Sequence, residues 1–599
     1  MSCSQLTLLK STMGQVELNR RTLGVTFDAG QKAKIRLWAP YASQVALTIN
    51  RDSLTLPLTR SELGYWSAET DQLKPGDRYS FVLENEEEYA DPASLVQPDG
   101  VYGPSQAFDT SAFYWEDTCW VNPPFDEYII YELDVYTFSA EGTFMGIADK
   151  LGYLKALGVN AIVIRPVTPF PDAQKGHHPD IFMYAVQASY GGPGQLQKLV
   201  NACHYEGIAV TVDLSYNHVD QQKQYLEDVA ARCTGSDDRN RRRTGNNGRA
   251  WRQARRQYIV ENALMWLRDF HVDALRLNDL QVLPDAEAVL SDIRQQADAL
   301  TGLTGRHYYL LVEDSPEQEA DQDAEPMGGG RPVKADQAYR NYYETDGHTR
   351  KAYREDFIYD RQFSSVLREL FGREAETIVS EPSVMFTRPH EAGHGLSATE
   401  EGGGQPSFES MKLMAGSILV SPYVPSLFMG DEWGGTNPFA VLTPAEGGTE
   451  ASADTDQDLA AAASDAQPDE TNKTLYAYYQ ALTRLRRQQP ALYHLNRKQT
   501  SVNQQPDQET MVVHRWYERN DILCLMNFSE EKREITVPAL NTYWHKLIDS
   551  ADPAWLGPEA GPEWLSDGDT ITLQPESILI YKGCDQPDPQ ACADEHVSV

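Results

Sequence analysis

The sequence predicts a multidomain protein. We expect an N-terminal β-sandwich over residues 1–120, a central (β/α)8 TIM barrel over 121–500, a C-terminal all-β domain over 501–583 and a polar tail over 584–599. Three observations lead to this fold class. The chain has 599 residues, too many for a single hydrophobic core. Apolar residues alternate with polar ones along residues 30–90, and further on short apolar runs alternate with amphipathic helical stretches.

The N-terminal region has the pattern of a small β-sandwich. Its apolar residues keep the period of two that places one face of each strand inside, as at Ile35, Leu37, Val45, Leu47 and Ile49. Proline and glycine turns such as Lys74-Pro75-Gly76-Asp77 separate these strands.

The central region contains repeated strand–helix units. Strands are expected at 129–131, 161–164, 208–214, 274–277 and 308–312, and helices at 147–157, 196–204, 258–270 and 286–300. Such repeats favour a parallel barrel whose site lies at the C-terminal ends of the strands. An open doubly wound sheet is the alternative, and the length of the region favours the barrel with insertions. The C-terminal region contains three further β-like runs, at Met511–Trp516, Ile522–Met526 and Ile571–Tyr581.

Composition limits the classes of partner. Lys and Arg number 52 against 88 Asp and Glu, a net charge of −36. This balance argues against nucleic acid and an anionic membrane surface, and it favours a neutral or cationic ligand. The longest apolar run, residues 411–429, contains Lys412 and two prolines, so we expect no membrane span. We expect a cytoplasmic protein, because the N-terminus lacks a signal-peptide pattern and the seven scattered cysteines suit reduced thiols.

Two segments differ in composition from the rest. Residues 444–470 are acidic and of low complexity, which indicates a disordered surface insertion. Residues 239–256 contain eight arginines and no acid. A helix is expected to begin near Trp251, where cations oppose the helix dipole, so helix stability does not account for these arginines. They either pair with the protein's own carboxylates or bind an acidic or phosphorylated partner from Arg239 to Arg256.

Polar residues gather where the expected barrel strands end. Asp213 ends one strand and is followed by Asn217 and His218, while Arg276 and Asn278 alternate with two leucines on the next strand. Glu313 ends a further buried strand, and the pair His390-Glu391 comes later in the chain.

In this order, these residues resemble the signature regions of glycoside hydrolase family 13, the α-amylase family. Within it, the likeness is greatest to the trehalohydrolases that act on maltooligosyl trehalose. Four further stretches carry the likeness: Asp91–Ser105, Tyr131–Phe144, Ser189–Pro193 and Ser421–Gly434. The resemblance implies a sandwich, a (β/α)8 barrel and a β-sheet C-terminal domain.

The resemblance also implies roles for single residues. Glu313 falls on the acid/base position, Glu391 on a third-acid position where the family has aspartate, and Asn278 on the nucleophile position. The remaining positions are implied to bind substrate: Asp180, Asp213, Asn217, His218, Arg276 and His390. A retaining glycosidase needs a carboxylate nucleophile about 5–5.5 Å from a carboxylic acid. An amide oxygen is a poor replacement for that carboxylate.

Several departures from the family pattern therefore point to impaired chemistry. A stacking tyrosine of the family is replaced by Pro179, and the asparagine before the sugar-binding histidine by Pro389. Arg276, facing a neutral residue, is free to pair with Glu313 instead. We expect a catalytically impaired or inactive pseudoenzyme that binds α-glucan, maltooligosyl trehalose or a protein partner. The alternatives are a working hydrolase that uses Glu313 and Glu391, or polar residues kept only as a hydrogen-bonded network. No cofactor and no metal are expected.

Overall fold

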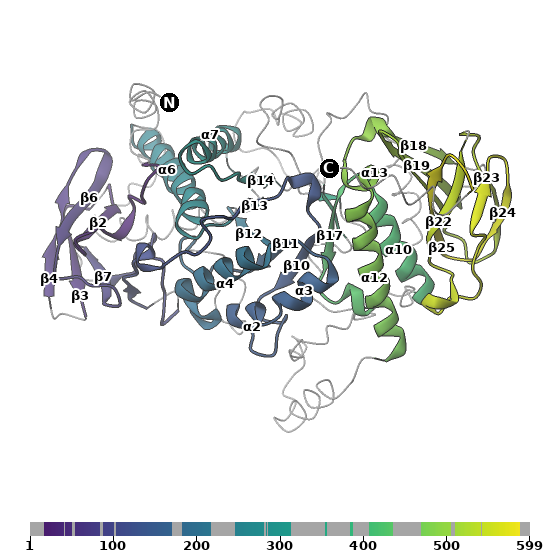
Figure 1. The fold of residues 1–599 in the computed structure, drawn as a ribbon. Coiled ribbons are helices and arrows are strands. Elements are labelled where there is room, and N and C mark those ends of the chain that lie inside the picture. Colours follow the sequence, from purple (N-terminus) through teal and green to yellow (C-terminus); the bar gives the residue numbers. More distant parts are fainter. Residues whose placement is uncertain are drawn as a thin grey trace, which may run out of the picture.

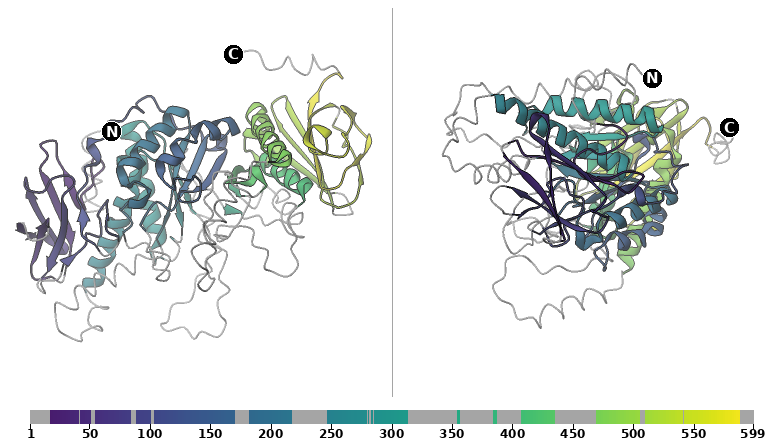
Figure 2. Two further views of the ribbon diagram at one scale, coloured as in Figure 1. Left: turned by 90° about the horizontal axis from the view of Figure 1, so that it is seen from below. Right: turned by 90° about the vertical axis from the view of Figure 1, so that its left-hand side faces the viewer.

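The computed structural model describes residues 17–169, 182–216, 246–312, 407–434 and 469–587, with short gaps inside these ranges, and the short strands at 354–355 and 384–386. Within them, three regions lie in a row (Figure 1). The N-terminal sheets lie at one end, the parallel sheet with its helices in the middle, and the C-terminal sheets at the other end; the left view of Figure 2 shows the same order. The expected fold class is confirmed.

The N-terminal region is a sandwich of two antiparallel sheets. One sheet has the order β1-β2-β6-β5 and the other β4-β3-β7-β8, with β9 also paired to β7. The alternation noted in the sequence appears as burial, because Ile35, Leu47 and Phe81 all lie in the core between the sheets. The strands are β1 Gly24–Phe27, β2 Ala33–Trp38, β3 Val45–Ile49, β4 Leu54–Pro57, β5 Thr59–Arg60, β6 Tyr65–Thr70, β7 Arg78–Leu83, β8 Glu88–Tyr89 and β9 Ser105–Gln106.

The central region contains eight parallel strands in barrel order. The sheet runs β14-β13-β12-β11-β10-β17-β16-β15, so the first strand along the chain, β10, pairs with both β11 and the last strand, β17. An open doubly wound sheet does not have this arrangement. The strands are β10 Ile130–Asp134, β11 Ala161–Arg165, β12 Ala209–Ser215, β13 Ala274–Asn278, β14 Tyr309–Val312, β15 Arg354–Glu355, β16 Val384–Phe386 and β17 Val424–Phe428.

Helices follow most of these strands. The stretch expected as one helix at 147–157 forms two short helices, since Asp149 and Lys150 separate α2 from α3. The helix expected to begin near Trp251 begins five residues earlier, within the arginine-rich segment. The helices are α2 Phe144–Ala148, α3 Leu151–Leu157, α4 Gly192–Glu206, α6 Asn246–Asp269, α7 Ala286–Thr304, α10 Phe408–Val420, α12 Glu470–Gln488 and α13 Pro490–Tyr493.

The C-terminal region is all-β and packs on α10. Its larger sheet has the order β18-β19-β20-β25-β22-β23, and β21 pairs with β24. The run expected at Ile571–Tyr581 is two strands separated by a turn. The strands are β18 Thr500–Gln504, β19 Thr510–Tyr517, β20 Asn520–Asn527, β21 Arg533–Thr536, β22 Tyr543–Asp549, β23 Trp564–Ser566, β24 Thr570–Leu573 and β25 Ser577–Cys584.

A buried carboxylate fastens the N-terminal region to the barrel. Glu261, on α6, is fully buried and accepts hydrogen bonds from the backbone amides of Thr22 and Leu23 and from the Thr22 hydroxyl. Nearby, the Tyr65 hydroxyl donates to Gln257 at 2.8 Å. Burial raises the pKa of Glu261, although these donors work against the rise. The sandwich is therefore held on α6, the helix that begins within the arginine-rich segment.

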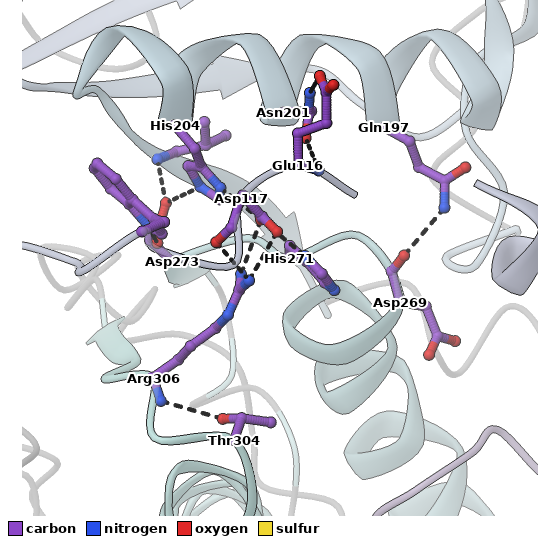
Figure 3. Close-up of polar contacts among 12 residues, drawn as sticks. Glu116, Asp117, Gln197, Asn201, His204, Asp269, His271, Asp273, Thr304 and Arg306 are labelled. Carbon is purple, nitrogen blue, oxygen red and sulfur yellow. Dashed lines mark hydrogen bonds and ion pairs between the residues drawn. The ribbon is translucent and has the colours of Figure 1, made fainter. Parts of the chain in front are cut away.

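A network of charged residues lies at the N-terminal ends of the barrel strands, and Figure 3 shows its contacts. The His204 ring lies between two carboxylates, with Nδ1 2.9 Å from Asp117 and Nε2 2.9 Å from Asp273. Asp117 also accepts from His271 and from Arg306, at 2.9 and 2.8 Å. Burial works to lower the pKa of His204, but the two carboxylates outweigh it and raise the pKa, so the imidazolium is favoured.

None of the helices in the described ranges combines the length and the apolar character that a membrane crossing needs. Cys119, Cys203 and Cys524 are free thiols, in line with the expectation from the sequence. Cys584 differs, because it is disulfide-bonded.

Candidate functional site

The barrel interior is built in layers. Its lower layer is apolar and includes Ile130, Val163, Ala209, Ala274 and Leu311. Successive side chains of a strand point to opposite faces, so the residue two positions further on faces the interior again. Further along the interior face, each of four neighbouring strands carries a charged residue: Glu132, Arg165, Asp213 and Arg276. The C-terminal end of the sheet therefore carries a polar layer, at the end where barrel enzymes have their sites.

Glu132 lies at the centre of this layer. Its carboxylate forms a two-pronged ion pair with Arg276, at 2.8 and 3.3 Å, and a second ion pair with Arg165, whose Nε is 3.0 Å away. Glu132 and Arg276 are almost fully buried. Burial works to raise the pKa of Glu132, but the two guanidinium groups outweigh it and lower the pKa. Glu132 is therefore held as an anion and is engaged on both oxygens.

Asp213, on β12, joins the two polar residues of β13. It is in register with Arg276 and accepts hydrogen bonds from the Arg276 guanidinium and from the side-chain amide of Asn278. Asn278 is 8% exposed, and its Oδ1 has no hydrogen-bond partner among the described residues. That oxygen is itself buried, so it is an unpaired acceptor inside the polar layer.

The charges cancel within the cluster formed by the five residues of this layer: Glu132, Arg165, Asp213, Arg276 and Asn278. Two guanidinium groups face two carboxylates, and the amide at position 278 adds none. A carboxylate in its place would lie against Asp213 and leave the cluster with a net negative charge. This balanced cluster suits hydrogen bonding to a neutral ligand, and both of its carboxylates are already engaged by arginine.

Three of the nine residues singled out in the sequence are described, and the structure brings all three together: Asp213, Arg276 and Asn278. The other six lie outside the described residues: Asp180, Asn217, His218, Glu313, His390 and Glu391. The expected pairing of Arg276 with Glu313 is untested for the same reason; the partners seen for Arg276 are Glu132 and Asp213.

Glu132 and Arg165 were missed as site residues. The signal was present, because Glu132 lies between the buried residues Tyr131 and Leu133 of its strand and Arg165 ends the next strand. A charge in a buried strand must be paired, and two such residues of opposite sign on neighbouring strands predict a pair. Among the described residues, no group of three or more His, Cys, Asp or Glu side chains is placed to hold a metal ion.

A second buried carboxyl lies just after β17, also at the C-terminal end of the sheet. Glu432, in the 3-10 turn Asp431–Trp433, is 1% exposed and accepts from the hydroxyls of Tyr131 and Tyr153. Its other oxygen, Oε2, has no hydrogen-bond partner among the described residues. Burial raises the pKa of Glu432 to about 7, against the pull of the two tyrosines.

The last arginines of the arginine-rich segment pair within the chain. On α6, Arg255 forms an ion pair with Asp285, and Arg256 with Asp292. Arg256 also donates to the carbonyl of Ala288 at 3.1 Å. For these two residues, pairing with the protein's own carboxylates is the correct alternative. The side chains from Arg239 to Arg249 lie outside the described residues.

Two family profiles match the chain. The first, described as "Alpha amylase, catalytic domain", matches residues 104–256, and the second, "Carbohydrate-binding module 48 (Isoamylase N-terminal domain)", matches residues 22–98. The first match contains β10, β11 and β12, and the second lies within the N-terminal sandwich.

Curated relatives carry the name malto-oligosyltrehalose trehalohydrolase. The protein of Saccharolobus solfataricus is 32% identical over 447 residues, covering 69% of this chain and 74% of the relative. That of Brevibacterium helvolum is 26% identical over 91% of this chain and 98% of the relative. Among solved structures, a putative α-amylase from Salmonella typhimurium has a TM-score of 0.67 at 22% identity, covering 94% of this chain and all of that one. The group B Streptococcus pullulanase SAP with maltotetraose also reaches 0.67, at 16% identity over 96% and 88%.

Proposed function

Because the chain belongs to the malto-oligosyltrehalose trehalohydrolases of the α-amylase family, we propose that it binds α-glucan or maltooligosyl trehalose in the barrel mouth but hydrolyses it poorly or not at all. The reaction of an active relative would be hydrolysis of the α-1,4 bond next to a terminal trehalose unit. In this chain the fold and part of the polar layer are kept, and the covalent step is lost.

One observation carries this proposal: the side chain of Asn278, at the nucleophile position, is an amide that donates to Asp213. An amide oxygen neither attacks the anomeric carbon efficiently nor stabilises the oxocarbenium ion as a carboxylate does. Loss of a catalytic nucleophile typically costs on the order of 10⁴-fold or more in turnover. The neighbouring carboxylates, Glu132 and Asp213, are engaged by arginine, which supports the view that neither replaces it.

The electrostatics favour a sugar as the ligand. The cluster around Arg276 has no net charge, which suits a neutral ligand that binds through hydrogen bonds. Structural neighbours are pullulanases in complex with maltotetraose, maltotriose and maltose, which supports the same class of ligand here. Glu313 as acid/base, Glu391 as third acid and the remaining substrate-binding positions belong to this proposal.

The test is to measure turnover and binding separately. The protein is incubated with maltooligosyl trehalose and with maltoheptaose while trehalose and reducing ends are followed, and binding of both is measured by calorimetry. We expect binding without turnover above trace levels. Turnover that disappears in a Glu313→Gln variant would overturn the proposal and establish the working hydrolase instead.

Two further proposals concern where the protein is located and whether it binds an acidic partner. The free thiols favour a cytoplasmic location, whereas the disulfide at Cys584 does not. An acidic partner for the arginines before Arg255 stays a prediction. It requires binding that weakens with salt, and a pull-down unchanged in 0.5 M salt would count against it.

A further inference from the structure

An exposed tyrosine lies on the turn that follows β10. Tyr136 is 50% exposed, although it stands between Val135 and Phe138, both of which are fully buried. The turn is at the C-terminal end of β10, two residues beyond its last residue, on the same strand that carries Glu132. Tyr136 therefore stands at the end of the barrel where the polar layer lies.

The turn that holds Tyr136 is fixed on every side. The Val135 amide donates to the Arg165 carbonyl at 2.9 Å, and the Phe138 amide donates to the Asp134 carbonyl at 3.0 Å. The Asp134 carboxylate accepts from both the amide and the hydroxyl of Thr137, at 2.8 and 2.9 Å. An exposed ring on so constrained a backbone is pre-organised, and little entropy is lost when a ligand covers it.

One edge of the Tyr136 ring packs against a glycine. A Cβ atom on Gly142 would lie 3.2 Å from Cδ2 and 3.6 Å from Cε2 of the ring, and 3.0 Å from the Tyr136 carbonyl oxygen. Gly142 also has a φ of +56°, a conformation that side chains other than glycine's disfavour. The glycine thus supports the ring from one side and leaves about half of the residue open.

The neighbourhood of the ring is that of a sugar site. The same turn is bonded to the last residue of β11, Arg165, which pairs with Glu132 in the polar layer. Tyr136 also lies close enough to Tyr190, after β11, to affect its electrostatics. A flat aromatic face beside hydrogen-bonding groups is complementary to a pyranose, which has apolar C–H faces and a rim of hydroxyls.

From these observations we propose that Tyr136 is the aromatic platform on which a glucosyl ring of the ligand stacks in the barrel mouth. It would replace the stacking tyrosine that the sequence lacks at Pro179. This inference rests on the proposed binding of α-glucan and adds the residue that carries much of the affinity. A single exposed tyrosine is ordinary on a protein surface, but its rigid turn and its place beside the polar layer distinguish this one.

The test compares three variants of the full-length chain by titration with maltoheptaose. Tyr136→Ala removes the platform, and we expect about tenfold weaker binding, from the apolar area that the ring covers. Tyr136→Phe keeps the ring face and should bind within about twofold of the wild type. The matched control is Tyr205→Ala, because Tyr205 is 86% exposed on the last turn of α4, at the opposite end of the barrel. We expect no change there.

The outcomes separate the two proposals. If Tyr136→Ala binds maltoheptaose as tightly as the wild type does, Tyr136 is not the platform. The proposed function would be unaffected by this result. Equal losses in Tyr136→Ala and Tyr205→Ala would also overturn the platform, since the effect would not be specific to the mouth. If the wild type binds neither maltoheptaose nor maltooligosyl trehalose, both proposals fail. If the wild type binds the glucan and also hydrolyses it, the proposal that the protein is a pseudoenzyme is wrong. In that case a raised KM in Tyr136→Ala still supports Tyr136 as the platform.

Discussion

Changing Asn278 to aspartate should destabilise the protein in a pH-dependent way. In the wild type the Asn278 amide donates to an Asp213 oxygen. In Asn278→Asp a second carboxylate replaces the donor, the two like charges are in contact, and the cluster changes from neutral to a net charge of −1. We therefore expect the pKa of the new carboxyl to lie above its ordinary value of about 3.9.

The magnitude follows from Coulomb's law. Two unit charges about 4 Å apart interact by about 4 kcal/mol at an effective dielectric constant of 20. Arg276, which is bonded to Asp213, offsets part of this repulsion, so we expect a net loss of about 2 kcal/mol at pH 7.5. A carboxyl with a raised pKa costs nothing below its unfolded-state pKa, and the cost grows as the pH rises through the folded-state pKa. The penalty should therefore be small at pH 4.

Thermal unfolding of the wild type and of Asn278→Asp at both pH values measures this difference. We expect a midpoint lowered by roughly 3 °C at pH 7.5 and little changed at pH 4. Asn278→Ala is the matched control, because it removes the same hydrogen bond without adding a charge and should show no such dependence on pH. An equal loss by Asn278→Asp at both pH values would refute the charge argument.

Three further substitutions test buried groups. Glu432→Gln should gain about 3 kcal/mol of stability relative to the wild type as the pH rises from 5 to 9, because the pKa of Glu432 is about 7 and its charged form is disfavoured; a difference constant with pH would contradict this. His204→Gln should cost about 3 kcal/mol at pH 6 and less at pH 9, since the raised pKa of His204, beside Asp273, makes its stabilisation complete below about pH 6.5 and lost as the pH rises through the raised value; a larger cost at pH 9 would reverse the assignment. Glu261→Ala should speed hydrogen exchange at the amide of Thr22, which loses its acceptor; unchanged exchange would show that the clamp is unimportant.

The general architecture followed from patterns in the sequence, because hydrophobic periodicity reports directly which face of an element is buried. The strands near Ala161, Ala209 and Ala274 were placed within one or two residues of their observed bounds. The boundaries of helices were harder to predict from the sequence. The two-residue interruption between α2 and α3 leaves the apolar periodicity intact, so nothing in the pattern distinguishes two short helices from one.

The candidate site was predicted only where local alternation was enough. Arg276 and Asn278 were expected on one face of a strand, and both contact Asp213. The other partner of Arg276, Glu132, lies 144 residues away along the chain. No local pattern contains that pairing, because it depends on how the sheet curves and brings β10 and β13 together across the barrel interior. Tyr136 was missed for a similar reason, since exposure within a buried turn is visible only in three dimensions.

The most direct test of the account is trehalose release from maltooligosyl trehalose by three proteins: the wild type, Glu313→Gln and Asn278→Asp. We expect that the wild type releases no more trehalose than Glu313→Gln while still binding the substrate. Activity that appears in Asn278→Asp would show that the amide alone prevents the covalent step. Clear turnover by the wild type, abolished in Glu313→Gln, would contradict the central claim.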